Sequence, residues 1–569
     1  MKNLEIAKIF REIVSILEIK GDNPFRIRAY ERAAQNIENL TEDIEDYARQ
    51  DKLKQIPGIG DDLSDKIKEF VKTGKIKFYS QLKKQVPAGI LELLEIPGIG
   101  PKTAKLLYEQ LDIKKLSDLE KAIKNGKLAG LAGIKEKTVS NIVKGIEILK
   151  QGRQRMSLAV AMKVADGFIR PLEKLAQTKK ISSAGSLRRR KDTVRDIDIL
   201  ITSPDPAKIM DVFVKLPPVK DVLAKGPTKS SVRTKEGVQV DCRVVEEKSF
   251  GAALVYFTGS KNFNIKLRRL AIKNGLKINE YGVFKKDRFV CGRSEAELFG
   301  ALRLAYIEPE LREDNGEIEL AMQARLPELI SPKDIKGDLH VHSRWSDGNN
   351  SIEEMVEGCR KRNYSYVAIT DHSQGLKIAG GLSIADLAKK KRQIEKLNKG
   401  LKNFTILFAT EVDIDSEGKL DYPDSVLKEF DIVVAAIHSG FKQSREKLTK
   451  RLITACENRY VHIIAHPTGR LWGVREAYAL DFYELFKVAG QTNTSMEINS
   501  FTQRLDLNDS NCRHAKEMGV KLAISTDAHS RDQLNAMNLG VYVARRGWLG
   551  KANVINTLPL DELLKAIKK

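Results

Sequence analysis

The sequence predicts a chain of several domains, with an all-α part, an α+β part and a C-terminal β/α barrel. At 569 residues the chain is too long for one hydrophobic core and should hold roughly three to five domains. Apolar residues recur at helical spacing in residues 1–150, whereas apolar strands alternate with helices beyond residue 336. All eight histidines lie between His340 and His529, so the two ends of the chain carry different chemistry.

The composition is that of an ordinary globular protein, with 42% hydrophobic and 31% charged residues. No apolar run approaches the roughly 18 residues of a membrane span, and residues 1–5 lack the apolar core of a signal peptide. The five cysteines are scattered and include no Cys-x-x-Cys pair, which indicates reduced thiols in a cytoplasm.

The net charge of +22 is concentrated in the N-terminal half. Residues 336–569 carry 35 Lys and Arg against 29 Asp and Glu, which leaves 63 against 47 in residues 1–335. A basic surface of this kind suits a polyanionic partner such as nucleic acid. The net charge by itself does not separate this interpretation from a lysine-rich surface that is only solvated, which is equally compatible with it.

A short glycine pattern repeats within the helical part. Ile56–Gly60 and Ile96–Gly100 have the same sequence, and Leu131–Lys135 is a weaker third copy, each before a helix. Alternate glycines let backbone N–H groups approach a phosphate, and the following helix presents its N-terminus to the same anion. One such turn means little, but three copies resemble helix-hairpin-helix motifs, which bind the DNA backbone. The candidate DNA-binding residues are Gly58, Gly60, Gly98, Gly100 and Lys102.

Short β-rich runs begin near residue 180 and place three carboxylates together. Asp196 and Asp198 are two residues apart on a strand and so project to one face, and Asp241 lies on a second run. Three carboxylates make a hard oxygen site suited to Mg²⁺, which can serve in-line displacement at phosphorus. An isolated Asp-x-Asp would be weak evidence.

The surrounding motifs add a resemblance. Gly185-Ser186 precedes the carboxylates, and Tyr256–Ser260 is followed by Asn264 and Arg268. Together these motifs resemble the DNA polymerase X family, the polymerase beta group, over residues 1 to about 317. The resemblance implies Mg²⁺ or Mn²⁺ at Asp196, Asp198 and Asp241. It also implies nucleotide contacts at Gly185, Ser186, Arg189, Tyr256, Phe257, Gly259 and Asn264, and a template contact at Arg268.

Two positions depart from that family. Lys261 stands where relatives often carry an acidic or neutral residue. We expect its positive charge to bind an incoming nucleotide even when no DNA is bound. The alternative is a solvated lysine without this role. Lys66 aligns with a Schiff-base lysine of some relatives that remove 5′-deoxyribose phosphate. Amine catalysis requires a neutral amine, and Asp62 replaces a basic neighbour, so a phosphate-binding role for Lys66 is favoured.

Histidines and carboxylates follow the apolar strands of the C-terminal part. Parallel barrels keep their chemistry at this rim, so the side chains should converge on two or three Mn²⁺, Zn²⁺ or Fe²⁺ ions. The set resembles the PHP (polymerase and histidinol phosphatase) family over residues 336–569 and fills its nine ligand places. These are His340, His342, Asp347, His372, Glu411, His438, His466, Asp527 and His529. Asp371 is expected to support a ligand, and His462 and His514 to be packing or surface residues.

The expected domains are an N-terminal helical domain (1–85), helical fingers (86–152), a nucleotidyltransferase palm (153–246), a thumb (247–317), a linker (318–335) and the PHP domain (336–569). The resemblances imply a bacterial or archaeal polymerase that fills short gaps in base-excision repair. The PHP domain would act as a 3′–5′ exonuclease or 3′-phosphodiesterase, and incision at abasic sites is a further expected activity. We expect gapped or nicked DNA and dNTPs as partners, no membrane, a monomer, a nucleoid-associated location and no further domain before Met1.

Three alternatives remain open. The first half could serve only to bind DNA for a nuclease, although intact carboxylates disfavour this. The second half could be a small-molecule phosphatase, which the helix-hairpin-helix repeats disfavour, or a metal-stabilised scaffold without activity.

Overall fold

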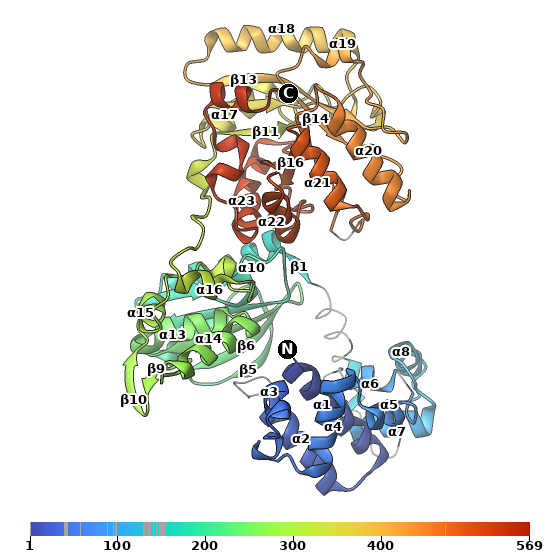
Figure 1. The fold of residues 1–569 in the computed structure, drawn as a ribbon, viewed down its shortest axis with the longest axis vertical. Coiled ribbons are helices and arrows are strands. Elements are labelled where there is room, and N and C mark those ends of the chain that lie inside the picture. Colours follow the sequence, from blue (N-terminus) through green and yellow to red (C-terminus); the bar gives the residue numbers. More distant parts are fainter. Residues whose placement is uncertain are drawn as a thin grey trace.

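The computed structural model describes residues 2–38, 44–56, 58–87, 89–94, 96, 99–128, 131, 134, 138–139, 142–143, 146, 155–472 and 474–569. It confirms the predicted fold class, with a helical part, an α+β part and a parallel β/α barrel (Figure 1). The helices of these residues include none that is long and apolar enough to cross a membrane. All five cysteines are free thiols.

The N-terminal part packs short helices around one apolar core that includes Phe10, Ile13 and Tyr30. Its helices are α1 (Lys2–Lys20), α2 (Pro24–Glu38), α3 (Ile44–Arg49), α4 (Asp61–Thr73), α5 (Lys77–Lys83), α6 (Ile90–Leu93), α7 (Pro101–Leu111) and α8 (Leu116–Lys124).

The same hydrogen bond spans the repeated glycine pattern in each copy. The Ile59 N–H donates to the Ile56 carbonyl at 3.1 Å, and Ile99 and Ile134 make the corresponding bonds at 3.0 Å. Gly60 and Gly100 are the N-caps of α4 and α7, so these helices point their N-termini out of the turn. Gly58 has a φ of +82°, which favours glycine, and Lys102 lies in the first turn of α7. Gly98 lies outside the described residues.

The segment predicted to be the palm contains a five-stranded sheet of order β2-β4-β7-β6-β5, in which β4 and β7 run parallel and the other pairs antiparallel. Its strands are β2 (Lys180–Ser183), β4 (Asp196–Thr202), β5 (Val219–Lys225), β6 (Lys229–Thr234) and β7 (Gln239–Val245), and β1 (Met156–Ser157) pairs with β3 (Thr193–Val194) beside it. The palm helices are α10 (Leu158–Glu173), α11 (Gly185–Arg188) and α12 (Pro206–Phe213).

The thumb combines helices with an antiparallel sheet of order β10-β9-β8. Its elements are α13 (Phe250–Thr258), α14 (Lys261–Lys273), β8 (Lys277–Asn279), β9 (Gly282–Lys285), β10 (Arg288–Cys291), α15 (Glu295–Ala301) and α16 (Glu317–Met322).

The segment predicted to be a linker, residues 318–335, includes most of helix α16 and several buried side chains. Ile318 and Ala321 of α16 are buried in the thumb core, and Ile330 is buried in the large cluster that joins palm and barrel. The proline and acidic residues that suggested a tether surround these few apolar side chains, which pack and fix the segment.

The C-terminal part is a seven-stranded parallel sheet in sequential order from β11 to β17. The strands are β11 (Gly337–Val341), β12 (Tyr366–Ile369), β13 (Thr405–Asp413), β14 (Ile432–Ala436), β15 (Ile463–Ile464), β16 (Ser495–Asn499) and β17 (Leu522–Ser525). The helices around them are α17 (Ile352–Arg360), α18 (Ile384–Gly400), α19 (Asp424–Leu427), α20 (Arg445–Glu457), α21 (Phe482–Gln491), α22 (Asp509–Glu517), α23 (Met537–Arg546) and α24 (Leu560–Ala566).

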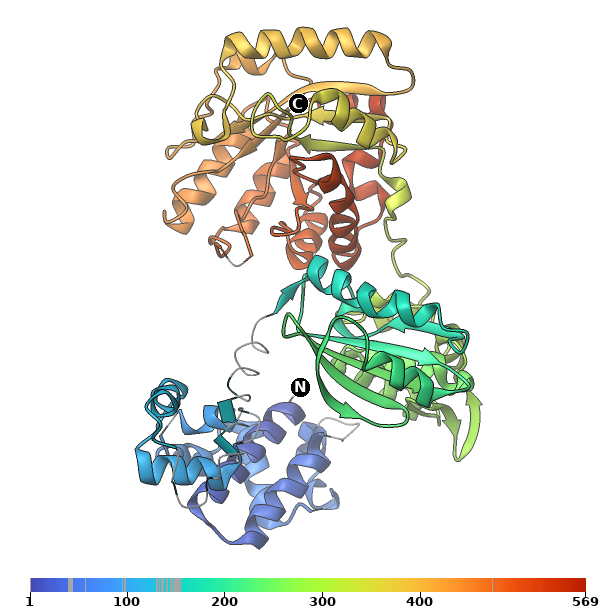
Figure 2. The same cartoon turned by 180° about the vertical axis from the view of Figure 1, so that it is seen from behind.

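The barrel is nearly closed just beyond its first and last strands. The Asp527 N–H donates to the His340 carbonyl at 3.0 Å, and the His342 N–H donates to the Ala528 carbonyl at 2.9 Å. These bonds bring the histidines at the end of β11 beside the Asp-Ala-His segment that follows β17. Helices α22 and α23 form the side of the barrel that faces the palm and thumb, as the view from behind also shows (Figure 2).

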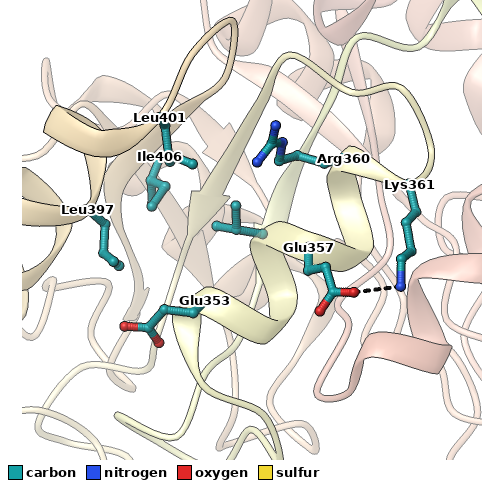
Figure 3. Close-up of a pocket in the computed structure, with 8 residues that line it drawn as sticks. Glu353, Glu357, Arg360, Lys361, Leu397, Leu401 and Ile406 are labelled. Carbon is teal, nitrogen blue, oxygen red and sulfur yellow. Dashed lines mark ion pairs between the residues drawn. The ribbon is translucent and has the colours of Figure 1, made fainter.

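A pocket of about 460 Å³ lies on the outside of the barrel between α17 and α18 (Figure 3). Apolar side chains such as Leu397 and Ile406 line it, and Glu357 pairs with Lys361 at its edge. It includes none of the predicted metal ligands and is separate from the sites below.

Candidate active sites

The three carboxylates predicted in the palm lie on two neighbouring strands. Asp196 and Asp198 belong to β4 and Asp241 to β7, and Asp198 is the direct partner of Asp241 in the parallel register. Burial, with the charges of Asp196 and Asp241, raises the pKa of Asp198 to about 6. Such crowding of carboxylates favours a bound cation.

These carboxylates do not form a tight donor cluster. Asp241 accepts hydrogen bonds from Ser231 and from Gln239, and Asp196 accepts one from Arg195 at 3.3 Å. Among the described residues, the donor groups that converge within 4.8 Å are all in the C-terminal barrel. The palm site has the donor types for divalent cations, but the side chains of Asp196 and Asp241 are engaged with protein partners.

Gly185 lies directly against Asp198 at the start of α11. Its φ is +61°, and a Cβ atom there would lie only 2.3 Å from Asp198 Oδ2. Both the backbone conformation and the lack of space require glycine. Ser186 follows in α11, so the predicted phosphate-binding turn adjoins the carboxylates.

A buried ion-pair network joins this turn to the thumb. Arg188 donates two 2.7 Å hydrogen bonds to Glu295, which also accepts one from Arg312. Burial acts to raise the pKa of Glu295, but the two guanidinium groups lower it to about 2. Sequence reasoning did not find Glu295.

The predicted sugar-binding residues lie at the end of α13. The rings of Tyr256 and Phe257 are 5.1 Å apart, and Gly259 has a φ of +72°. Arg189 donates to the Thr258 carbonyl and pairs with Glu313 at 3.0 Å. Arg189, which is predicted to bind phosphate, thus lies beside the residues predicted to bind the sugar.

Helix α14 carries the remaining predicted nucleotide and template contacts. Asn264 Nδ2 donates to the Tyr256 carbonyl at 2.7 Å, and Arg268 Nε donates to the Asn264 carbonyl at 3.4 Å. Lys261 is the first residue of the helix.

In the N-terminal part, Lys66 forms an ion pair with Asp62, the acidic neighbour identified in the sequence. Its Nζ also lies 5.0 Å from the centre of the Phe78 ring, and its side chain is 12% exposed. The amine is therefore enclosed between an anion and an aromatic face.

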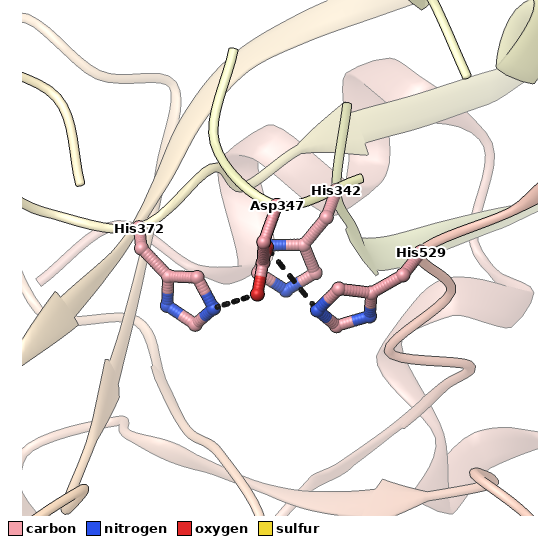
Figure 4. Close-up of side chains that lie close together, drawn as sticks. All are labelled: His342, Asp347, His372 and His529. Carbon is pink, nitrogen blue, oxygen red and sulfur yellow. Dashed lines mark ion pairs between the residues drawn. The ribbon is translucent and has the colours of Figure 1, made fainter. Parts of the chain in front are cut away.

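All nine histidines and carboxylates predicted in the barrel converge at or just beyond the carboxyl ends of its strands. Three overlapping groups have ligand atoms within 4.8 Å of one another. They are His342, Asp347, His372 and His529 (Figure 4); His340, His342 and Asp527; and His372, Glu411 and His438.

Glu411 lies at the centre of this cluster. Its Oε1 is 2.9 Å from His466 Nε2 and 3.2 Å from His438 Nε2, and its Oε2 is 3.0 Å from His372 Nδ1 and 3.3 Å from His340 Nε2. His342 Nε2 lies 3.5 Å from Oε2 as well, and one buried carboxylate beside five imidazoles is suited to bind metal ions.

The electrostatics of the cluster fit divalent cations. Burial, with the charges of His529 and His372, lowers the pKa of His342 to about 3, so its ring is in the neutral form that binds metals. Burial also acts against protonation of His372, yet Glu411 and Asp347 raise its pKa to about 10. These carboxylates attract protons to the place where a cation would supply positive charge. The buried Nδ1 atoms of His342 and His466 have no hydrogen-bond partner among the described residues.

Several supporting residues were not predicted from the sequence. Glu497 accepts a 2.7 Å hydrogen bond from His340 Nδ1, and Asp413 lies 3.0 Å from His438 Nδ1, so both fix the orientation of a ring. Arg504 lies 3.2 Å from Asp527. The sequence offered one signal for Glu497 and Asp413: each is an acidic residue in an otherwise largely apolar strand, β16 and β13 respectively.

The other three singled-out residues lie outside the cluster. Asp371 accepts hydrogen bonds from Ser343 and Ser346 and pairs with buried Lys390 at 2.9 Å, so it supports the loop that carries Asp347. His462 accepts a hydrogen bond from the Val433 N–H, and His514 packs against Phe486.

Fold and sites together define a DNA polymerase of the polymerase beta type joined to a PHP domain, and known families match in the same order. Residues 1–76 match the helix-hairpin-helix domain, 90–147 the SAM-like helix-hairpin-helix tandem, 253–313 the DNA polymerase beta thumb and 338–500 the PHP domain.

Relatives cover either the whole chain or one of its halves. The Bacillus subtilis protein named DNA polymerase/3′-5′ exonuclease PolX is 40% identical and aligned over 100% of both chains. A probable phosphatase of Thermoanaerobacter sp. is 32% identical over 39% of this chain and 89% of its own. DNA polymerase lambda of Arabidopsis thaliana is 28% identical over 53% of this chain and 58% of its own. The chain belongs to the PolX family of DNA polymerases.

Proposed function

We propose that this protein is a DNA-directed DNA polymerase that fills short gaps during base-excision repair, and that its PHP domain acts on 3′ ends as a 3′–5′ exonuclease or 3′-phosphodiesterase. Incision at abasic sites is a further activity proposed for the same centre. The observation that carries the proposal is the end-to-end match with the Bacillus subtilis polymerase and exonuclease, in a chain that holds both sets of site residues.

In the polymerase half, Asp196, Asp198 and Asp241 would hold Mg²⁺ or Mn²⁺ at the reacting phosphate. Ser186 and Arg189 would bind the β and γ phosphates of a dNTP, and the Gly185 turn brings them beside Asp198. The remaining proposed nucleotide contacts are Tyr256, Phe257, Gly259, Lys261 and Asn264, with Arg268 on the template strand.

In the PHP half, the nine ligands would hold two or three Mn²⁺, Zn²⁺ or Fe²⁺ ions, with Glu411 shared between ions. When bound, divalent cations polarise phosphoryl oxygens and favour ionisation of the attacking hydroxyl or water at either centre. Glu497 and Asp413 hold the rings of His340 and His438 in place, which keeps the donor geometry fixed.

The proposed partners are gapped or nicked duplex DNA and dNTPs, and the proposed state is a monomer associated with the nucleoid. The glycine turns before α4 and α7, with Gly58, Gly60, Gly98, Gly100 and Lys102, would bind the DNA backbone and give no sequence preference. The ion pair with Asp62 supports a binding role for Lys66.

A phosphatase role for the PHP half has one observation in its favour, the match to the Thermoanaerobacter probable phosphatase. The two roles differ in substrate: a phosphatase takes small phosphate monoesters, whereas the proposed enzyme takes phosphodiesters at DNA 3′ ends.

The test offers the protein a one-nucleotide-gapped duplex with a single dNTP, and separately a 3′-labelled duplex and p-nitrophenyl phosphate. We expect incorporation of the templated nucleotide and release of the 3′ label at a rate well above monoester hydrolysis. No incorporation in Mg²⁺ or Mn²⁺ would support a half that only binds DNA. Faster hydrolysis of the monoester would support the phosphatase.

A further inference from the structure

The arginine proposed to bind nucleotide phosphates is already paired with an anion. Arg189 follows α11, and its Nε donates to Glu313 Oε1 at 3.0 Å. Its Nη1 donates to the Thr258 carbonyl and is so close to Gly259 that a Cβ atom there would lie 3.1 Å away. The guanidinium of Arg189 therefore lies beside Thr258 and Gly259, in the predicted nucleotide-binding segment, while Glu313 neutralises part of its charge.

The same carboxylate is shared with the PHP domain. Arg546, the last residue of α23, donates from Nη1 to Glu313 Oε1 at 3.1 Å and to the Arg189 carbonyl at 2.7 Å. Its side chain is only 4% exposed, and Asp509 of the PHP domain holds it through two hydrogen bonds of 2.6 and 2.8 Å. The PHP domain thus touches both the backbone of Arg189 and the carboxylate that competes for its side chain.

Further contacts hold the rest of this loop. The Arg190 guanidinium lies 4.3 Å from the centre of the Tyr542 ring, and Arg470 donates to Asp192 at 3.1 Å. Residues 189–192 connect Ser186 to the strand that carries Asp196 and Asp198. The PHP domain therefore contacts the segment between the proposed phosphate site and the metal site through three side chains, those of Arg470, Tyr542 and Arg546.

We propose that Glu313 competes with the incoming nucleoside triphosphate for Arg189, and that Arg546 weakens this competition, so that the PHP domain sets the nucleotide affinity of the polymerase site. The inference rests on the proposed function, because it requires Arg189 to contact the triphosphate. Glu313 also lies 3.9 Å from Lys191, so the cluster holds three cations (Arg189, Lys191 and Arg546) and two anions (Glu313 and Asp509), which sum to +1. Without Arg546 the sum is zero and Glu313 is left to Arg189 and Lys191, whereas without the charge of Glu313 the sum is +2.

The signs of the expected effects are therefore opposite. Arg546→Met should raise the KM for dNTP in gap filling about fivefold, and Glu313→Gln should lower it about twofold. In the Glu313→Gln background, Arg546→Met should change the KM by less than about twofold, because the competitor that Arg546 restrains is gone. The kcat should change little in each variant, since these side chains bind and do not react.

Arg545 provides a matched control for general loosening of the interface. It precedes Arg546 on α23, is also largely buried, and donates to Glu310 at 2.7 Å and to the Ile330 carbonyl at 3.1 Å. Within the part of the chain that the structure describes, its hydrogen bonds and ion pairs are with Glu308, Glu310 and Ile330 and not with Glu313 or Arg189. Arg545→Met should leave the KM for dNTP within about twofold of the wild type.

The experiment measures steady-state gap filling by the full chain, with release of a 3′ label as the check that the PHP domain is folded. Opposite shifts in the single variants and loss of the Arg546 effect in the double variant support the proposal. Additive effects, or an equal shift in Arg545→Met, overturn it. If Arg546→Met does not fold, an unchanged or raised KM in Glu313→Gln still overturns it. A wild type that incorporates no nucleotide refutes the proposed function as well, whereas a wild type that incorporates while its variants are unaffected refutes only this inference.

Discussion

Replacement of Gly185 by alanine should disable the polymerase site through one collision. The added Cβ atom would lie 2.3 Å from Asp198 Oδ2, whereas ordinary van der Waals contacts begin at 3.4 Å. The carboxylate oxygen must therefore move by 3.4 − 2.3, or about 1.1 Å, away from the position it takes beside Asp241.

The expected size of the effect follows from this displacement. A misplacement of about 1 Å in a reacting constellation costs about 100-fold in rate, which corresponds to about 2.7 kcal/mol. The positive φ of +61° adds about 1 kcal/mol of backbone strain to the folded state. We expect kcat/KM for gap filling to fall about 100-fold and the protein to remain folded.

Gly275 offers a matched control. Its φ is +70°, similar to that of Gly185, but nothing lies within 4 Å of a Cβ atom built there. Gly275→Ala should introduce the same backbone strain without a steric clash. We therefore expect gap filling to stay within about twofold of the wild type. The assay is single-nucleotide incorporation on a gapped duplex, with exonuclease activity measured on the same samples. If Gly185→Ala keeps activity within threefold of Gly275→Ala, the reasoning from this contact is wrong.

Three further predictions concern buried charges. Because the folded pKa of Glu295 is about 2 against an ordinary 4.5, its ionised form contributes about 3 kcal/mol of stability above pH 4.5, which is lost as the pH falls toward 2. Glu295→Gln should lower the free energy of opening of thumb amides in hydrogen exchange by about 3 kcal/mol at pH 7 and by much less at pH 3, and equal losses at both pH values would contradict the pairing. Glu497→Gln removes the partner of His340 Nδ1 and should weaken Mn²⁺ binding by about 10- to 100-fold in calorimetric titration without affecting gap filling in Mg²⁺; an unchanged Kd would show that Glu497 has no orienting role. Borohydride should trap no adduct between Lys66 and an incised abasic site, because Asp62 holds the amine in an ion pair; an adduct that is lost in Lys66→Ala would reverse this view.

The sequence predicted the barrel and the convergence of its histidines and carboxylates because both signals are local. Each of these side chains lies at or just after the end of an apolar run, and parallel strands bring those ends to one rim. The carboxylates of the palm follow the same logic, since two residues on one strand share a face. The glycine turns were predictable because their hydrogen bonds span three residues.

Features that depend on packing between distant segments were not predictable. Glu497 is 157 residues from the ring that it orients, and its sequence neighbours show only an acid in an apolar strand. Glu313 and Arg546 are 233 residues apart. No periodicity links them.

The segment predicted to be a linker shows how little a local composition signal says about packing. Proline and acidic residues are typical of connecting segments, but Ile318, Ala321 and Ile330 are enough to fasten this segment to two cores. The three residues are too few and too far apart to form a periodic pattern.

The most direct test of two independent active centres in one chain uses a labelled one-nucleotide-gapped duplex with Mn²⁺, with and without dNTPs. The wild type is compared with Asp198→Ala in the palm and His342→Ala in the PHP domain. We predict that extension is lost only in Asp198→Ala and that 3′ degradation is lost only in His342→Ala. Degradation that persists in His342→Ala, or extension that persists in Asp198→Ala, would contradict the assignment of the corresponding centre.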